Sequence, residues 1–333
     1  MRILLASDAW PPQVNGVVRT MLAVNRELEA AGHQVIALTP DRFRTFPCPF
    51  YPEIPLALAP ARRAARMIAA AAPDAIHIVT EGPIGLAARR WCLAHDRDFT
   101  TAYHTRFPEY LAGRFIAPKA ITYALLRRFH APSKAVMVAT ESVRRELDLH
   151  GFRNLVPWGR GVDPALFGPQ LRDESSEFKR PIFLSVGRVA QEKNLSAFLS
   201  LDLPGSKVVV GEGPALPALR RRFPDTHFLG RRENGILARL YASADVFVFP
   251  SRTDTFGLVL LEALASGLPV AAYPVPGPLD VIGDSGTGVL DEDLGRAARA
   301  ALDVSRERCR EHALKFSWAA CARQFVECLE RVR

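Results

Sequence analysis

The sequence lacks the features that mark membrane-spanning and secreted proteins. None of its apolar runs reaches the roughly 18 residues that suggest a spanning helix. The short apolar start Met1-Arg2-Ile3-Leu4-Leu5 leads directly into a polar loop, which is unlike a secretory signal. We therefore expect a cytoplasmic protein without a membrane span.

Paired cysteines are also lacking. The chain has five cysteines with neither a C-x-x-C pair nor a partnered histidine, namely Cys48, Cys92, Cys309, Cys321 and Cys328. Disulfide frameworks and zinc sites both need closely spaced ligands. We expect reduced, packed thiols and a protein that uses no metal and no resident cofactor.

Nucleotide-cofactor fingerprints are missing or incomplete. No G-x-G-x-x-G follows the first strand-like run, Gly211-Glu212-Gly213-Pro214 lacks a third glycine, and no G-x-x-x-x-G-K-[ST] occurs. Asp96-Arg97-Asp98 has a metal-binding D-x-D form, but it follows a helical stretch and precedes a strand, which favours a polar turn. A dinucleotide site is therefore disfavoured.

Length and charge bound the remaining possibilities. With 333 residues, 48% of them hydrophobic, the chain is long enough for two domains with separate cores. The net charge of +8 lies wholly in residues 1–160, which hold 21 Lys/Arg against 13 Asp/Glu. A basic half suggests an anionic lipid surface or nucleic acid as partner, although solvated helix faces explain it equally well. The basic residues lack stacking aromatics in the order of an RNA motif, which disfavours nucleic acid.

Strand-like and helical stretches alternate along the whole chain. Apolar runs at 2–7, 33–39, 75–80, 99–104 and 135–140 predict strands of a first half. The pattern restarts after a Pro- and charge-rich linker at 164–179, with strands at 181–186, 207–210, 226–229, 246–249 and 269–273. Such alternation is typical of a parallel sheet covered by helices on both faces.

We therefore predict an α/β protein of two Rossmann-like parallel-sheet domains. The expected bounds are 1–163 for the amino-terminal domain and 164–315 for the carboxy-terminal domain. A terminal helix at 316–333, with Trp318, Phe325 and Leu329 as apolar points, is expected to pack back on the first domain.

Two carboxylates stand on one strand-to-helix stretch. Asp254 follows the apolar run Val246–Pro250, and Glu262 lies eight residues later. If the helix ran unbroken between them, they would be separated by about 12 Å along its axis and could face one groove. Amides near Phe256 and Gly257 would meet a ligand at the helix start. Helix capping by Asp254 with a solvated Glu262 is the plain alternative.

Two cations follow the first strand of the second half. Arg188 and Lys193 lie in a loop at the carboxyl edge of the predicted sheet, where open α/β sheets bind ligands. Together they could clamp a diphosphate and stabilise the charge that develops on it as it leaves. Surface basic residues are the alternative.

Polar residues of the first half end at the equivalent edge. Asn15-Gly16 follows the first strand, and its glycine would allow close approach of a phosphate or an acceptor, or simply make a turn. His104 ends a predicted strand and would touch a sugar or a hydroxyl if it is functional. Asp8, Glu81 and Gly82 share this edge and are weaker candidates for the site.

Four blocks of the sequence, in this order, resemble retaining GT-B glycosyltransferases of family 4. They are Ser185-Val186-Gly187-Arg188 with Glu192-Lys193-Asn194, Val210 to Pro214, Ala244 to Ser251, and Phe256-Gly257 with Glu262-Ala263 and Gly267 to Val270. The resemblance covers nearly the whole chain. It implies the GT-B fold and transfer of a hexosyl group from a nucleotide-diphosphate sugar.

The resemblance also implies roles for individual residues. Arg188 and Lys193 would hold the diphosphate, Glu262 the ribose hydroxyls, and His104 the acceptor side. The implied donor-binding set is Gly16, Gly187, Arg188, Lys193, Asp254, Phe256, Gly257, Leu258 and Glu262. The first acid of the family's Glu-x7-Glu pattern is Asp254 here, one methylene shorter, which leaves the donor sugar open.

The runs Ser251 to Gly257 and Tyr273 to Pro278 look most like mannosyl- and glycolipid-forming members. They imply GDP-mannose, a UDP-hexose or UDP-glucuronate as donor, and a lipid or lipid-linked acceptor. We expect a peripheral location on the inner membrane face, through the basic first half. Transfer to a soluble sugar or sugar phosphate and a non-catalytic nucleotide-sugar-binding partner are the alternatives.

Overall fold

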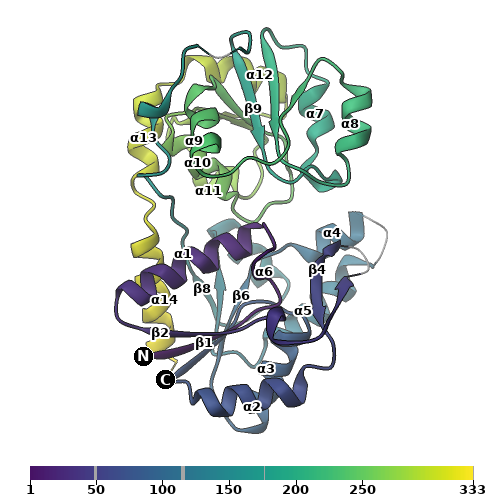
Figure 1. Ribbon diagram of the computed structural model, residues 1–333, viewed down its shortest axis with the longest axis vertical. Helices are drawn as coiled ribbons and strands as arrows, with labels where there is room; N and C mark the ends of the chain where they lie inside the picture. The colour runs from purple at the N-terminus through teal and green to yellow at the C-terminus, as the bar shows by residue number, and fades with distance from the viewer. Residues whose placement is uncertain (49–50, 114–116, 176, 333) are drawn as a thin grey trace. The chain divides into compact units, whose positions relative to one another are not determined.

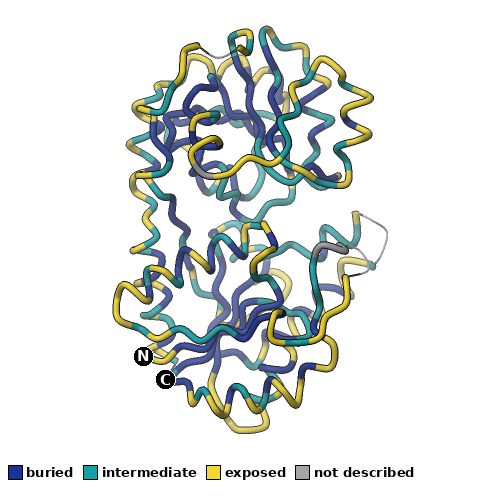
Figure 2. The backbone as a smooth tube through the Cα atoms, viewed as in Figure 1, coloured by how far each residue is buried: buried dark blue, intermediate teal, exposed yellow. Residues whose placement is uncertain are grey.

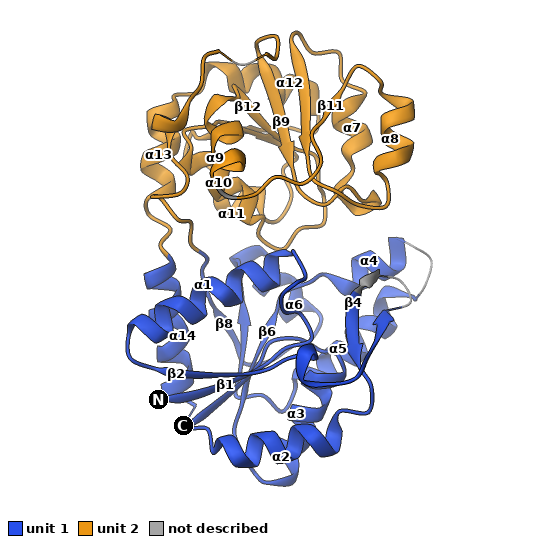
Figure 3. Cartoon of the chain, in the orientation of Figure 1, with its two compact units in different colours: residues 1–160, 318–333 blue, residues 161–317 orange. Residues whose placement is uncertain are grey.

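The computed structural model describes residues 1–48, 51–113, 117–175 and 177–332 (Figure 1). The chain divides into two compact units (Figure 3). Unit 1 comprises residues 1–160 and 318–333, and unit 2 comprises residues 161–317. The division therefore falls at 160/161 and 317/318, where the sequence predicted 163/164 and 315/316.

Unit 1 is built on a parallel sheet in the strand order β2-β1-β5-β6-β7-β8. Its strands are β1 (Arg2–Ala6), β2 (Gln34–Leu38), β5 (Ala75–Ile78), β6 (Thr100–Tyr103), β7 (Ala135–Val138) and β8 (Leu155–Pro157). Its helices are α1 (Gly16–Ala30), α2 (Ala61–Ala71), α3 (Pro83–Ala94), α4 (Phe107–Gly113), α5 (Lys119–His130), α6 (Glu141–Leu149) and α14 (Trp318–Glu330). Strands β3 (Thr45–Cys48) and β4 (Tyr51–Ala57) pair antiparallel beside this sheet.

Helix α14 belongs to unit 1 although it comes last in the chain. Its Phe325 and Leu329 join the buried cluster of Ile3, Met21 and Trp158. The indole Nε1 of Trp158 donates to the carbonyl of Cys321 at 3.1 Å. The apolar spacing of the final helix is therefore satisfied by the sheet and α1 of the first unit.

Unit 2 repeats the architecture in the order β11-β10-β9-β12-β13-β14, again parallel. Its strands are β9 (Ile182–Val186), β10 (Ser206–Val210), β11 (His227–Phe228), β12 (Val246–Phe249), β13 (Val270–Ala272) and β14 (Gly288–Leu290). Its helices are α7 (Leu195–Leu199), α8 (Leu216–Arg222), α9 (Asn234–Ser243), α10 (Leu258–Ala265), α11 (Pro278–Val281), α12 (Leu294–Ala300) and α13 (Arg306–Ala313). The prediction of two Rossmann-like parallel sheets is confirmed.

The central strands of both sheets are buried on both faces, as Figure 2 shows in dark blue. Every residue of β5, β6, β7 and β12 is buried. Such strands read as continuous apolar runs because helices cover both sides of a parallel sheet. The polar loops that follow each strand are thereby gathered at one edge of each sheet.

The expected linker at 164–179 proves to be part of unit 2 where the structure describes it. Arg172 donates to the carbonyl of Ala244 and to Asp245, and the Asp173 amide donates to Ser243 Oγ at 2.9 Å. The segment shows little apolar periodicity because hydrogen bonds of individual polar groups attach it to the end of α9.

Candidate active site

The loop after β9 is shaped by close contact with the loop after β10. The Gly187 amide donates to Val210 O at 3.0 Å, and the Val189 amide donates to Glu212 O at 2.8 Å. A Cβ at Gly211 would stand 1.8 Å from the Gly187 carbonyl oxygen, and φ at Gly211 is +143°. The incomplete glycine motif therefore serves loop packing, since only glycine fits there.

This loop carries two half-buried cations. The Arg188 guanidinium lies 3.7 Å from Glu192 Oε1 within the same loop. The Lys193 Nζ lies 2.5 Å from Asp254 Oδ1, which comes from the loop after β12. The side chains of Arg188 and Lys193 keep 31% and 26% of their surface exposed, so both charges remain within reach of a ligand.

Two further hydrogen bonds join the same pair of loops. Asn194, with φ +53° between η3 (Gln191–Lys193) and α7, donates its side-chain amide to Pro250 O at 3.1 Å. Ser251 Oγ donates to Glu192 O at 3.4 Å. The structure thus brings the predicted residues Arg188, Lys193 and Asp254 together at the carboxyl edge of the unit 2 sheet.

The helix does not run unbroken from Asp254 to Glu262. Gly257 has φ +83°, and α10 begins only at Leu258. The assumption of one continuous helix was wrong because the left-handed glycine ends the loop before the helix starts. A Cβ at Gly277 would stand 3.1 Å from Phe256 O. The loop from Asp254 to Gly257 is therefore packed closely against a second turn.

Glu262 lies inside unit 2 with 7% of its surface exposed. The Tyr241 hydroxyl of α9 donates to Glu262 Oε2 at 3.0 Å. Charged carboxylates are rarely this buried without partners. The solvated Glu262 of the plain alternative is therefore wrong, and Tyr241 is a neighbour that sequence spacing did not reveal.

In unit 1, Asn15 caps α1. Its Oδ1 accepts from the Val18 amide at 3.0 Å, which satisfies one of the free amides of the first turn. Gly16 is the first helical residue, and a Cβ there would meet no atom within 4 Å in the described structure. The space beside the Gly16 backbone is open in unit 1.

Asp8 has a structural position. Its carboxylate accepts from the Ile84 and Gly85 amides at 2.9 and 3.3 Å and from Thr80 Oγ1. It thereby satisfies two amides in the first turn of α3, and burial raises the pKa of Asp8. Glu81 lies 3.2 Å from His130 Nε2. These contacts within unit 1 explain why polar side chains stand at positions 8 and 81 at this edge of the sheet.

His104 follows β6 at the carboxyl edge of the unit 1 sheet. Its Nδ1 lies 3.4 Å from an Nη of Arg160, a buried residue that follows β8. Burial, together with the charge of Arg160 and the nearby His77 and His130, lowers the pKa of His104 well below its usual value. Arg160 was missed in the sequence because it stands in a loop without periodicity.

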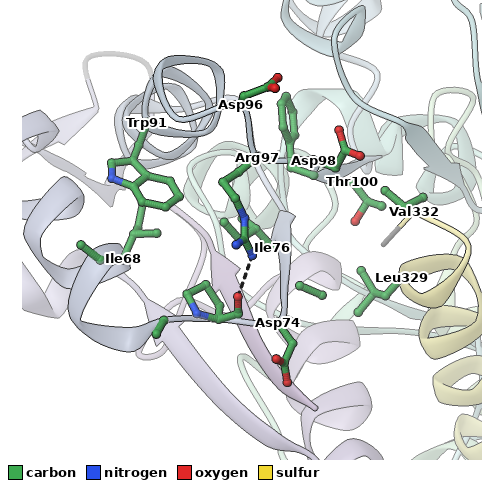
Figure 4. Close-up of a pocket in the computed structure, with 15 residues that line it drawn as sticks. Ile68, Asp74, Ile76, Trp91, Asp96, Arg97, Asp98, Thr100, Leu329 and Val332 are labelled. Atoms are coloured by element: carbon green, nitrogen blue, oxygen red, sulfur yellow. Dashed lines mark hydrogen bonds between the residues drawn. The ribbon is translucent and has the colours of Figure 1, made fainter.

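A pocket of about 620 Å³ lies in unit 1 at the opposite edge (Figure 4). Its lining includes Asp74, Ala75 and Thr100, at or just before the first residues of β5 and β6, together with Trp91 and Arg97. Arg97 donates to Pro73 O at 2.8 Å, shown dashed in Figure 4. The Asp96-Arg97-Asp98 turn thus lies at the amino ends of these strands, far along the sheet from His104 and Gly16. In the described part of the chain, no cluster of three His, Cys, Asp or Glu side chains could hold a metal.

Two family models match the two halves of the chain. Residues 14–166 match the model described as glycosyltransferase family 4, and residues 180–306 match that described as glycosyl transferases group 1. Together they span most of both sheets.

Curated relatives match nearly the whole chain. A GDP-mannose-dependent alpha-mannosyltransferase of Mycolicibacterium smegmatis is 31% identical, over 87% of this chain and 84% of that protein. The sulfoquinovosyl transferase SQD2 of Arabidopsis thaliana is 30% identical over 89% of this chain, which spans 66% of that protein. An alpha-monoglucosyldiacylglycerol synthase of Streptococcus pneumoniae is 29% identical, over 94% and 81% respectively.

The fold is also found among solved structures. A sucrose-phosphate synthase from Thermosynechococcus elongatus aligns with a TM-score of 0.76 at 20% identity, covering 99% of this chain and 98% of that one. Because this chain has two parallel Rossmann-like sheets and aligns with that structure over nearly its whole length, the architecture is GT-B.

Proposed function

The chain belongs to glycosyltransferase family 4, and on that premise we propose that it moves a hexosyl group from a nucleotide-diphosphate sugar to a lipid or lipid-linked acceptor. The donor is GDP-mannose, a UDP-hexose or UDP-glucuronate. The transfer proceeds with retention and without a metal ion. The observation that carries this proposal is the pair of accessible cations, Arg188 and Lys193, beside Asp254 at the carboxyl edge of the unit 2 sheet.

Unit 2 supplies the donor site. A guanidinium binds phosphate oxygens bidentately, while an ammonium acts as a compact charge, so Arg188 and Lys193 suit a diphosphate. Glu262 accepts the ribose hydroxyls, and its position is fixed by Tyr241. The loop of Asp254, Phe256, Gly257 and Leu258 faces the sugar, and Gly187 leaves the backbone accessible, since a Cβ there would meet no atom within 4 Å.

In the reaction, the bond between the sugar C1 and the diphosphate oxygen breaks while the acceptor oxygen bonds to C1 from the same face. The acceptor proton passes to the leaving phosphate. Arg188 and Lys193 take up the negative charge that develops on the diphosphate. Because these side chains supply the positive charge, EDTA should leave turnover unchanged, and a loss of turnover restored by a divalent cation would contradict metal independence.

The lipid acceptor is supported by two observations. One relative is named as an alpha-monoglucosyldiacylglycerol synthase. In unit 1, α5 exposes Ile121 and Leu125 at 55% and 64%, four residues apart on one face, beside the exposed Arg128. A helix face that joins apolar and basic side chains suits an anionic membrane surface. The described residues contain no helix long and apolar enough to span a bilayer.

Membrane binding is tested by sedimentation with phosphatidylglycerol vesicles. Binding should weaken as salt rises, because the attraction is screened. The double substitution Ile121→Ser with Leu125→Ser should reduce binding, and the control is Leu279→Ser with Leu302→Ser, two exposed leucines of unit 2 that stand next to Asp280 and Asp303. Equal sedimentation with neutral and anionic vesicles would remove the support for an anionic surface.

Donor choice is tested by thermal shift against GDP-mannose, UDP-glucose, UDP-glucuronate and UDP-galactose. A donor that binds only the native state raises the Tm. Stabilisation by one donor, followed by its turnover in the presence of lipid extract, is the expected result. A product that stays in the aqueous phase would favour a soluble acceptor, and binding without any donor turnover would favour a non-catalytic partner.

A further inference from the structure

Arg160 is a buried cation at the carboxyl edge of the unit 1 sheet. It follows β8 and exposes 5% of its surface. One Nη donates to Trp158 O at 2.8 Å and to Gly159 O at 2.9 Å. The guanidinium carbon lies 4.3 Å from the centre of the Trp158 ring. Carbonyl oxygens and an aromatic face therefore hold the guanidinium in one place.

No carboxylate of the described residues forms an ion pair with Arg160. Burial lowers the pKa of Arg160 to about 10, so the group is still charged at neutral pH. A buried charge without a paired opposite charge is unfavourable, so its interactions with the remaining neighbouring groups matter. The second Nη of the guanidinium lies 3.4 Å from His104 Nδ1. The charge of Arg160 therefore acts on the imidazole of His104.

The contact fixes the proton of His104. An arginine side chain has donors only and stays protonated, so it cannot accept a hydrogen bond from the imidazole. His104 Nδ1 must therefore present its lone pair to Arg160. In a neutral imidazole, the proton then resides on Nε2.

The surroundings of His104 also keep it neutral. Arg160 faces it from the end of β8, His77 from β5 and His130 from α5. The carboxylate of Glu81 lies against His130 Nε2 at 3.2 Å. Trp158 closes one side, with its ring 5.8 Å from that of His104. These groups disfavour a second proton on the ring.

We propose that Arg160 is a positioning residue that holds His104 as the neutral tautomer with its proton on Nε2, so that His104 donates a hydrogen bond to a substrate oxygen and does not act as a general base. That the acceptor of this hydrogen bond is an oxygen of the sugar or of the acceptor substrate rests on the proposed function. The tautomer of His104 does not, because it follows from contacts within unit 1.

The tautomer is read by long-range ¹H–¹⁵N NMR on the full chain with ¹⁵N-labelled histidine. The signals of His104 are assigned by their loss in His104→Gln. We expect protonated Nε2 and unprotonated Nδ1 at pH 7. A proton on Nδ1, or a doubly protonated ring, in the unsubstituted protein would overturn the proposal whether or not the protein transfers sugar.

Two substitutions at Arg160 sharpen the test. Arg160→Met removes the donor and the charge, so both tautomers should appear and the pKa of His104 should rise. Arg160→Lys keeps a charged donor and should restore the Nε2 tautomer. The control is Arg89→Met, because Arg89 likewise donates to two carbonyls of unit 1, Phe129 O and Arg128 O, and lies over the Phe129 ring. An unchanged His104 spectrum in folded Arg160→Met would contradict the proposal.

Kinetics separate positioning from a structural role. For Arg160→Met we expect kcat to fall roughly tenfold, the size of effect of one hydrogen bond that involves a charged group. Its pH profile should gain an acidic limb as His104 begins to titrate, and Arg160→Lys should lack that limb. If Arg160→Met does not fold, the unsubstituted and lysine spectra still decide the tautomer. Absent transfer by the unsubstituted protein would count against the proposed function alone.

Discussion

The two units carry polar residues at the same edge of similar sheets, but they hold them in different ways. In unit 1, His77, His104 and Arg160 are enclosed by neighbouring side chains, and burial sets their protonation. In unit 2, Lys193 and Asp254 form a partly exposed ion pair between two loops. The comparison teaches that unit 1 encloses its hydrogen-bonding groups, two histidines that are kept neutral and one charged arginine, whereas unit 2 keeps partly exposed charges available to a ligand.

This difference follows from the free energy of charge burial. A buried charge without a partner is unfavourable by several kcal/mol, so an enclosed histidine stays neutral. A partly exposed ion pair contributes only about 0.2–1 kcal/mol to stability. Substitutions in unit 2 should therefore alter activity more than stability, and those in unit 1 should alter stability and its pH dependence.

The largest expected effect is on turnover in unit 2. Arg188→Ala and Lys193→Ala should each lower kcat by about 100- to 1,000-fold, since loss of one donor to developing charge costs about 2.7–4 kcal/mol. The Tm should change little, because both side chains are partly exposed. Steady-state kinetics and a thermal melt check both values.

The matched control for these two variants is Arg299→Ala. Arg299 is an exposed arginine at the carboxyl end of α12 in unit 2, and it donates to Asp202 O at 3.0 Å. It should retain full turnover. Near-normal transfer by both Arg188→Ala and Lys193→Ala would remove the assignment of a diphosphate clamp.

A smaller effect is expected at Glu262. Glu262→Gln keeps the shape but loses the charge, so the KM for the donor should rise about tenfold or more, since a hydrogen bond to a charged group contributes about 1.5–3 kcal/mol. Tyr241→Phe, which removes the hydroxyl that donates to Glu262, should give a weaker rise. An unchanged donor KM in Glu262→Gln would contradict the ribose assignment.

The next effect concerns the pH dependence of unit 1. Burial lowers the pKa of His77 from 6.5 to about 3. The unfolded chain therefore binds the extra proton first, so this stability is fully present above pH 6.5 and is lost as the pH falls from 6.5 towards 3. Between pH 7 and pH 5, His77 should account for a loss of about 2 kcal/mol.

The measurement compares urea unfolding of the unsubstituted chain and His77→Gln at pH 7 and pH 5. Tryptophan fluorescence reports unit 1 alone, since Trp10, Trp91, Trp158 and Trp318 all belong to it. The raised pKa of Asp8 acts in the opposite direction but is shared by both proteins. Equal pH dependence in the two would show that folding leaves the pKa of His77 unchanged, which would contradict the effect of burial.

The smallest effect is expected for Asp254→Glu. The longer side chain restores the family's usual acid while keeping the charge beside Lys193. Relative kcat/KM between two donor sugars should change by no more than about fivefold, since a partly exposed pair contributes about 1 kcal/mol or less. Competition between GDP-mannose and UDP-glucose measures it, and a complete loss of turnover would show that Asp254 has a stricter role.

The fold was predictable because long apolar runs and helical spacing alternate in both halves. The strands β8 and β14 escaped prediction, since they are only Leu155–Pro157 and Gly288–Leu290. The hairpin of β3 and β4 was missed as well, because prolines interrupt its strand pattern. Short edge elements depend on their neighbours more than on their own sequence.

The candidate site was predictable only in part. Arg188, Lys193 and Asp254 follow buried strands, and parallel strands bring their carboxyl ends to one edge. Their bonding was not predictable, because the cross-loop contacts of Asn194 and Ser251 depend on tertiary packing. Likewise, nothing in the spacing of His104 and Arg160, 56 residues apart, reveals that they touch. The roles of the site residues remain predictions.

The central claim is retaining transfer from a nucleotide sugar, and a ¹H NMR time course tests it most directly. The purified chain is incubated with the donor that stabilises it and with lipid acceptor, and the anomeric signals of donor and product are followed. We predict consumption of the donor and a product with the donor's anomeric configuration. A product of inverted configuration, or no consumption of any of the four donors, would contradict the account.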